Sequence, residues 1–296
     1  MELRQHGELM QDRVEKNSSE LRLGFLGLGA VGAPMARNAL EDGRTVVVCD
    51  PDGAAVQRLQ AAGAAGAETA RGLAGEVDMV QVAVATGEQL EAALLDPAEG
   101  FLAGARPGQA VIIHSTVGAQ VCAAIAKEAQ RAGVAVVDAP VTGPDSAPQS
   151  AARREVTTLV GCDPEALAQV REALEISGSA IFHVGAVGDA QSVKLAANAL
   201  ALVQMQATHE TMQLLARLGI GSADAAAILS ASSASNWAVA HWDMVSQAGR
   251  AASRAIPAKD LELAVETARA AGLRLDLAER VRYSMSEAGH GFLAPS

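Results

Sequence analysis

Lys194 and Asn198 lie four positions apart in an apolar, helix-forming stretch. Residues at this spacing share one face of a helix, and their neighbours Leu195 and Ala197 are poor surroundings for a solvated ammonium group. Burial disfavours the charged form of lysine, so a lysine in such a place can donate or accept a proton near neutral pH. An amide one turn further on can orient a substrate hydroxyl. The residues also allow a second interpretation, in which Lys194 reaches water and Asn198 lies at the surface.

A second candidate site lies near the start of the chain, in the six residues Gly27, Leu28, Gly29, Ala30, Val31 and Gly32. They form the pattern G-x-G-x-x-G between an apolar run at 21–26 and a helix-forming run. In this context the first glycine permits a tight turn and the second lets the backbone approach a pyrophosphate. The third lets the helix pack closely on its strand. The pattern predicts a dinucleotide at a helix N-terminus, where free backbone N–H groups bind anions.

Asp50 closes the next predicted strand, where an acid can accept both ribose hydroxyls of an adenosine and repel the extra phosphate of NADP. It therefore favours NAD, although Arg44 and Arg58 lie near enough in sequence to leave NADP open. Alternatively, Asp50 belongs to an acidic turn that caps the following helix.

Two later strand ends are expected to line the same cofactor, because ligands of such folds bind outside the carboxyl ends of the strands. Val84 and Ala85 close one strand. Ser115 and Thr116 close another, and their hydroxyls could hold a ribose or a carboxamide, or cap the next helix.

Strand and helix patterns alternate through the first part of the chain, which predicts a mostly parallel sheet with helices on both faces. The predicted strands are 21–26, 45–50, 79–84, 110–113, 135–137, 157–160 and 180–183. Helices are expected between them, among others at 54–62, 88–95, 120–132 and 164–177. A long helix at 190–218, ending at Gly219, opens a wholly helical part with further helices at 223–230, 237–248, 259–271 and 275–288. The predicted organisation is a polar extension at 1–20, a dinucleotide-binding domain at 21–185 and a helical domain at 186–296.

Composition narrows the classes of function. The formal net charge of -11 argues against nucleic acid or an anionic membrane as partner. No apolar run reaches the about eighteen residues of a membrane span, and 1–20 lacks the apolar core of a signal peptide. Cys49, Cys122 and Cys162 are interpreted as apolar fillers in a reducing cytoplasm, and no His/Cys cluster has the spacing of a metal site.

Four motifs together resemble the β-hydroxyacid dehydrogenase family, which includes 3-hydroxyisobutyrate dehydrogenase and tartronate semialdehyde reductase. They are GLGAVGAPMARN from Gly27, DAPVTG from Asp138, the Lys194–Asn198 segment and Lys-Asp-Leu from Lys259. Their order and spacing match over nearly everything after residue 20. The resemblance implies a Rossmann domain followed by a helical domain, and hydride transfer between NAD or NADP and a small β-hydroxyacid or its semialdehyde.

The resemblance also assigns roles to single residues. It makes Lys194 the catalytic acid and base, which takes the proton of the substrate hydroxyl during oxidation. Asn198 would hold the substrate and Lys259 would lie near nicotinamide and substrate. Thr116 would contact the cofactor. Thr142 and Gly143 occupy the positions at which backbone amides of the family bind a substrate carboxylate. The resemblance further implies a homodimer or homotetramer.

The substrate loop departs from the family. The usual DAPVSGG is replaced by a sequence with Thr142, Gly143 and Pro144, and proline lacks the N–H that a glycine there would offer. Arg154 replaces a glycine and could bind an extra carboxylate, or be a solvated loop residue. Two alternatives follow: an imine reductase, which generally lacks a lysine at position 194, and a dinucleotide-binding sensor whose altered loop supports no turnover.

Overall fold

The computed structural model describes residues 21–178, 180–251 and 255–285. The predicted extension at 1–20 therefore lies outside the described residues, as does the end of the last predicted helix. The chain divides into two compact units after Gln191, whereas the sequence places the boundary at residue 185. The division falls later because the first turn of the long helix is hydrogen-bonded to the ends of the sheet strands, through Gln191.

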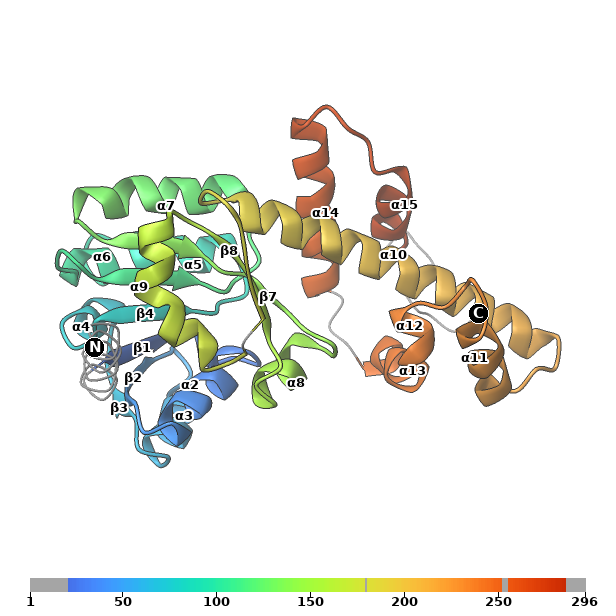
Figure 1. The fold of residues 1–296 in the computed structure, drawn as a ribbon, viewed down its shortest axis with the longest axis horizontal. Coiled ribbons are helices and arrows are strands. Elements are labelled where there is room, and N and C mark those ends of the chain that lie inside the picture. The colour runs from blue at the N-terminus through green and yellow to red at the C-terminus, as the bar shows by residue number, and fades with distance from the viewer. Residues whose placement is uncertain (1–20, 179, 252–254, 286–296) are drawn as a thin grey trace, which may run out of the picture. The chain divides into compact units, whose positions relative to one another are not determined.

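The first unit is built on a nine-stranded sheet (Figure 1). Its strands are β1 Arg22–Leu26, β2 Thr45–Cys49, β3 Ala65–Gly66, β4 Met79–Val82, β5 Ala110–Ile113, β6 Ala135–Asp138, β7 Val141–Thr142, β8 Thr157–Gly161 and β9 Ala180–Gly185. They lie in the order β3-β2-β1-β4-β5-β6-β8-β7, and β9 pairs with β8. Strands β1 to β6 pair in parallel, whereas β8 is antiparallel to β6 and β7.

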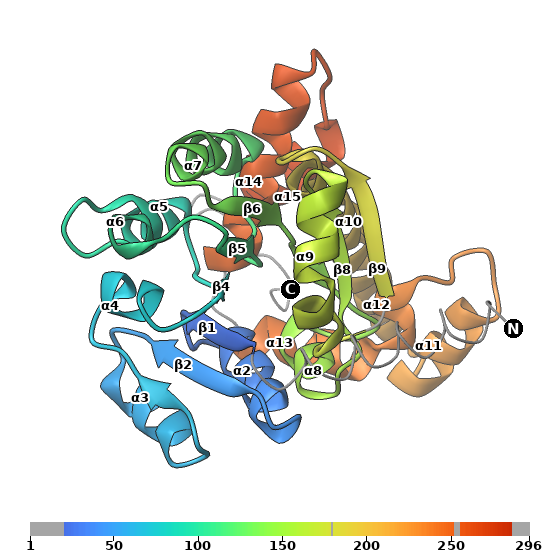
Figure 2. The same cartoon turned by 60° about the vertical axis from the view of Figure 1, so that its left-hand side comes forward.

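Helices cover both faces of this sheet (Figure 2). They are α2 Gly32–Glu41, α3 Gly53–Gln60, α4 Ala70–Ala74, α5 Gly87–Leu95, α6 Phe101–Gly104, α7 Ala119–Arg131, α8 Ala147–Ala152 and α9 Pro164–Glu175. Successive strand residues alternate between two cores, since strand side chains point to opposite faces. Val46 and Val48 belong to the core that also contains residues of α2, α3, α8 and α9, and Val47 belongs to the core that contains residues of α4, α5, α6 and α7. The predicted doubly wound α/β fold is confirmed.

The differences from the predicted strands are small. The strands β3 and β7 were not predicted, because two residues are too few for a periodic signal. Strand β4 ends at Val82 rather than Val84, so Val84 and Ala85 lie in the loop that follows it.

The second unit is helical. After α10 Asp189–Arg217 come α11 Ser222–Ser230, α12 Trp237–Ala240, α13 Trp242–Ala251, α14 Ala255–Ala270 and α15 Asp276–Met285. The helix α10 ends as predicted, with Gly219 in the left-handed conformation at φ +81°. The prediction of a single helix at 237–248 is wrong, because the helix is interrupted at His241 between α12 and α13. The Nδ1 atom of His241 bonds the Trp237 carbonyl at 2.9 Å. Apolar side chains of α10 and α14, among them Leu195, Leu202 and Leu261, form the core.

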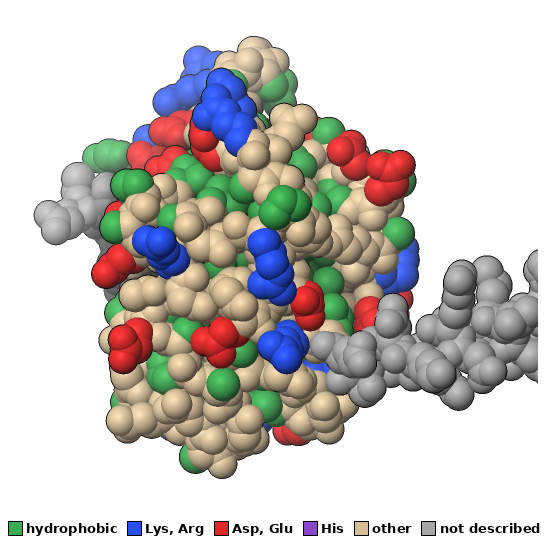
Figure 3. All heavy atoms as spheres, turned by 90° about the vertical axis from the view of Figure 1, so that its left-hand side faces the viewer, with side chains coloured by type: hydrophobic (Ala, Val, Ile, Leu, Met, Phe, Trp, Pro, Cys, Tyr) green, Lys and Arg blue, Asp and Glu red, His purple; other side chains and the backbone are tan. Residues whose placement is uncertain are grey.

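The surface of the described residues carries both signs of charge. On the face shown in Figure 3, Lys and Arg side chains stand among Asp and Glu side chains. Within the described ranges, no helix combines the length and the hydropathy that crossing a bilayer requires.

Candidate active site

The glycine turn between β1 and α2 is as tight as the pattern predicts. Gly27 has φ +84°, and a Cβ on it would lie 2.4 Å from the Ala83 carbonyl oxygen. A Cβ on Gly32 would lie 2.0 Å from the Gly27 carbonyl oxygen. A Cβ on Gly29, in contrast, would meet nothing within 4 Å. The first and third glycines are therefore required by the protein itself, whereas Gly29 borders open space where a ligand can approach the backbone.

Helix α2 begins at this turn without a side-chain cap. Its N-cap residue Val31 makes no side-chain hydrogen bond to the first turn, and Ala30 before it is exposed. Backbone N–H groups at a helix start are partners for an anion, and the helix dipole favours negative charge there. The arrangement fits the pyrophosphate of a dinucleotide.

Asp50 faces the glycine turn. Its Oδ2 accepts the Leu28 N–H at 2.5 Å, and its Oδ1 accepts the Asp52 N–H at 2.7 Å. The alternative interpretation, in which Asp50 belongs to an acidic turn that caps the next helix, is confirmed as well, because Asp52 in this turn caps α3 by accepting the Ala54 N–H. The backbone N–H of Leu28 is thus engaged within the protein.

A cleft of about 610 Å³ opens beside Gly27, Gly29 and Asp50. Val84 and Ala85, which follow β4, also line it, together with Glu68 and Thr69. A cleft lined by the glycine turn and an acid matches the adenosine half of NAD or NADP. The residues present therefore fit that cofactor.

Ser115 joins two strand ends. Its Oγ accepts the Val84 N–H at 2.8 Å, and its side chain is buried. The helix α7 that follows begins at Ala119 and has Gly118 as its N-cap. The alternative that Ser115 and Thr116 cap this helix is therefore wrong.

A buried polar network, missed in the sequence, supports these strand ends. The His114 ring bonds the Ala139 carbonyl through Nδ1 and lies 2.8 Å from Gln81 Oε1 through Nε2. Burial lowers the pKa of His114 to about 4, so the ring is neutral. Burial also raises the pKa of Asp138 to about 6, although backbone N–H groups of Gly188 and Gln191 favour its ionised form. No local motif signals this network, because its partners are distant in sequence.

The substrate loop begins with Thr142, the last residue of β7, which is half-buried. At Gly143 a Cβ would lie 2.2 Å from Ser150 Oγ, so the position requires glycine. Arg154 is not a free carboxylate ligand, because its guanidinium donates to Asp42 at 2.7 Å and to Glu41 at 3.3 Å. It ties the loop to the end of α2.

The second unit contains the predicted proton-transfer residues. Lys194 is 8% exposed, so the interpretation in which it reaches water is wrong. Burial lowers its pKa, and the negative charge of Asp260 acts in the opposite direction. Asn198 donates through Nδ2 to Asp260 Oδ2 at 2.8 Å, and Lys259 Nζ lies 3.0 Å from Asp260 Oδ1. In the sequence Asp260 is only the residue after Lys259; here it contacts Asn198 and Lys259 and acts electrostatically on Lys194.

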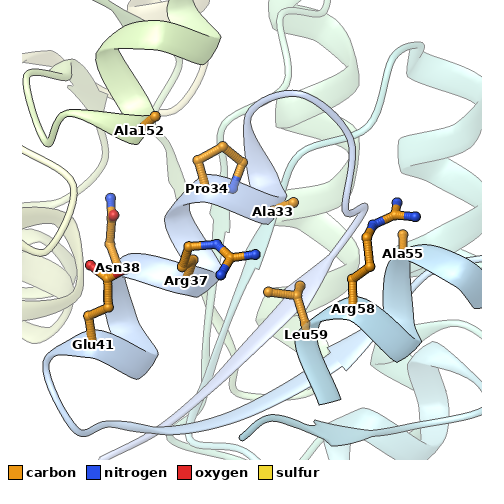
Figure 4. A pocket seen from close by; sticks show the side chains of 9 residues that line it. All are labelled: Ala33, Pro34, Arg37, Asn38, Glu41, Ala55, Arg58, Leu59 and Ala152. Atoms are coloured by element: carbon orange, nitrogen blue, oxygen red, sulfur yellow. The ribbon is translucent and has the colours of Figure 1, made fainter. Parts of the chain in front are cut away.

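A separate hollow of about 240 Å³ lies between α2 and α3, and Arg37 and Arg58 extend beside it (Figure 4). Arg58 lies 3.7 Å from Asp52, which itself contacts Asp50. Arg44, the other arginine considered for NADP, forms an ion pair with Glu172 at 2.6 Å. Of the two arginines, only Arg58 is linked to Asp50 by these contacts, through Asp52. Among the described residues, no group of His, Cys, Asp and Glu is arranged to hold a metal ion.

Comparison with known families agrees with this arrangement. The NAD binding domain of 6-phosphogluconate dehydrogenase matches residues 22–185. The family described as NAD-binding of NADP-dependent 3-hydroxyisobutyrate dehydrogenase matches residues 188–295. The chain belongs to the β-hydroxyacid dehydrogenase family.

Individual members of this family are similar over most of the chain. An NAD-dependent L-serine dehydrogenase of Pseudomonas aeruginosa is 36% identical over 260 residues, which are 84% of this chain and 86% of that protein. Human mitochondrial 3-hydroxyisobutyrate dehydrogenase is 32% identical over 221 residues, 74% of this chain and 64% of that protein. The structure of Mycobacterium tuberculosis 3-hydroxyisobutyrate dehydrogenase with L-serine superposes with a TM-score of 0.80. It is 28% identical and covers 93% of this chain and 97% of that one. Membership of this family identifies the chain as an NAD(P)-dependent oxidoreductase that acts on CH–OH groups.

Proposed function

We propose that the protein interconverts a small β-hydroxyacid and its semialdehyde, with Lys194 as the general acid and base. The observation that carries the proposal is a buried lysine on the same helix face as Asn198, whose pKa is lowered by burial and influenced by the charge of Asp260. A neutral lysine can accept the proton of a substrate hydroxyl, and its protonated form can return it; a lowered pKa makes the neutral form available at lower pH. Bound NAD(P) supplies the hydride acceptor or donor. The names of the relatives direct the choice of substrate to L-serine and 3-hydroxyisobutyrate.

We propose Thr142, Gly143 and Asn198 as the substrate-binding residues. The amide of Asn198 has Asp260 as acceptor for its Nδ2, so its Oδ1 is the atom we assign to the substrate. Pro144 offers no N–H, and the carboxylate must be held with one backbone donor fewer than in the usual family loop. Lys259 and Thr116 are proposed as contacts of the nicotinamide half.

One assay separates this function from the alternatives. The enzyme is incubated with NAD or NADP and either 3-hydroxyisobutyrate, L-serine or related β-hydroxyacids, and the absorbance of the reduced nicotinamide is followed. Reduction of NAD or NADP by a β-hydroxyacid supports the proposal. Turnover of a cyclic imine with NADPH, in the absence of hydroxyacid turnover, would identify an imine reductase. Cofactor binding without either turnover would identify a sensor.

Asp50→Ser is expected to reduce the preference for NAD over NADP by about tenfold or more, because it removes the negative charge that repels the 2′-phosphate. Paired measurements of kcat/KM with the two cofactors test this. Asp52→Ser is the matched control, since Asp52 caps α3 and is engaged by Arg58. An unchanged preference in the Asp50 variant, or an equal change in the control, would contradict the assignment.

Asp260→Asn is expected to displace the rising limb of the oxidation rate toward lower pH. Asp260 raises the pKa of Lys194 against the effect of burial, so its neutralisation lowers that pKa further and yields the neutral base at lower pH. In the reductive direction, where protonated Lys194 is needed, activity is lost at lower pH for the same reason. Profiles of kcat/KM against pH check the sign, with Asp276→Asn on α15, paired with Arg274, as control. A displacement toward higher pH would refute the coupling.

We further propose a homodimer or homotetramer in a reducing, cytoplasmic location. Leu200 and Leu214 on α10 and Leu218 directly after it are 61%, 59% and 68% exposed, which supports burial of this surface in an assembly. The three cysteines are unpaired, which supports a reducing compartment. Light scattering coupled to size exclusion measures the assembly.

A further inference from the structure

The side chain of Gln191, in the first turn of α10, is wholly buried. Its Oε1 accepts the Val117 N–H at 3.1 Å, and its Nε2 donates to the Ser115 carbonyl at 3.1 Å. Its backbone N–H donates to Asp138 Oδ2 at 3.0 Å. A glutamine is suited to this place because one flat group offers both a donor and an acceptor.

These partners lie at the strand ends from which the cofactor and substrate segments start. Ser115 and Val117 are the two neighbours of Thr116 in the chain, and Ser115 also holds the Val84 N–H. Asp138 is the last residue of β6 and precedes the loop that contains Thr142. The side-chain amide of Gln191 is therefore hydrogen-bonded to the backbone on both sides of Thr116.

We propose that Gln191 is a positioning residue, which fixes the backbone around Thr116 for the nicotinamide half of the cofactor. The inference rests on the proposed function only in the role of Thr116. An apolar side chain of the same length would leave the Val117 N–H and the Ser115 carbonyl buried without partners. The segment would then shift or open to water, and a displacement of about 1 Å at a reacting group is enough to slow catalysis strongly.

The chain offers a matched control. Gln109 is 2% exposed, and its side chain makes three hydrogen bonds to backbone, one more than the side chain of Gln191. Its Oε1 accepts the Arg106 N–H, and its Nε2 donates to the Ala74 and Val77 carbonyls at 2.8 and 2.7 Å. Gln109 directly precedes β5, whereas Ser115 follows that strand. A buried glutamine that bonds backbone can thus be removed at either end of one strand, and the loss at Gln109 is at least as large as that at Gln191.

The experiment compares Gln191→Met with Gln109→Met in the full-length enzyme. Both variants are expected to lower Tm. Only Gln191→Met should raise the Kd of NADH, by about fivefold, and lower kcat with β-hydroxyacids by about tenfold. The KM for the hydroxyacid should change less than about twofold, because the backbone N–H that holds Asp138 is retained. Hydrogen–deuterium exchange of the peptide covering 114–118 should be faster in Gln191→Met alone.

Equal effects of the two variants on Kd and kcat, or wild-type values in Gln191→Met, would overturn the inference. If Gln191→Met does not fold, Gln191→Glu takes its place. That variant keeps an acceptor for Val117 but sets an oxygen against the Ser115 carbonyl, and the same loss is expected. A wild-type protein that binds NADH but turns over no hydroxyacid would contradict the proposed function, whereas the exchange and NADH measurements still decide the role of Gln191.

Discussion

Lys194→Met is expected to lower kcat about a thousandfold, within the range typical of losing a general acid or base. Methionine is close in length and apolar, so it suits a position that is 8% exposed and next to Leu195 in the helical core. The Kd of NADH should stay within about twofold, because the glycine turn and Asp50 are unchanged. Single-turnover kinetics and NADH fluorescence measure the two quantities.

Two controls make this result specific. Lys127→Met removes a lysine of α7 that has no place in the site and should leave kcat unchanged. The rate that remains in Lys194→Met should no longer depend on pH in the range where Lys194 titrates. Substantial residual turnover with an unchanged pH profile would show that another group transfers the proton.

Substituting two glycines of the same motif is expected to have opposite effects, one on stability and the other on cofactor affinity. Gly32→Ala is expected to destabilise the protein by about 3 kcal/mol or more, because the new Cβ would lie 2.0 Å from the Gly27 carbonyl oxygen and neither backbone can yield easily. Gly29→Ala meets nothing within 4 Å, so its stability should be unchanged or about 1 kcal/mol higher through the unfolded state. Its Kd for NADH should nevertheless rise about tenfold, since the methyl group enters the space of the pyrophosphate.

Thermal unfolding and NADH titration of the two variants test this pair. Gly53→Ala serves as the control, since a Cβ there also meets no atom within 4 Å and Gly53 lies at the start of α3, outside the cleft. A stable Gly32→Ala protein would contradict the packing role of Gly32, and a Gly29→Ala protein with wild-type affinity for NADH would contradict the cofactor role of Gly29.

Local sequence was enough for the features that depend on neighbouring residues. The turn from Gly27 to Gly32, the acid at Asp50 and the shared face of Lys194 and Asn198 follow from spacing, because one turn or one helix fixes their geometry. The alternation of Val46, Val47 and Val48 between two cores follows in the same way from the pleat of a strand. These local rules account for the fold class and the cofactor class, whereas the family followed from the resemblance of four motifs.

Tertiary structure alone decided which distant groups meet. Asp260 lies 62 positions from Asn198, Ser115 lies 76 from Gln191 and Arg154 lies 112 from Asp42. Periodicity cannot encode such pairings, because they depend on how whole elements pack. Arg154 shows the consequence: the sequence allows it to bind a substrate carboxylate, but packing brings it to the acids at the end of α2. Lys194 shows the converse, since its position in the chain suggested a proton-transfer residue and only its burial decided that it is shielded from water.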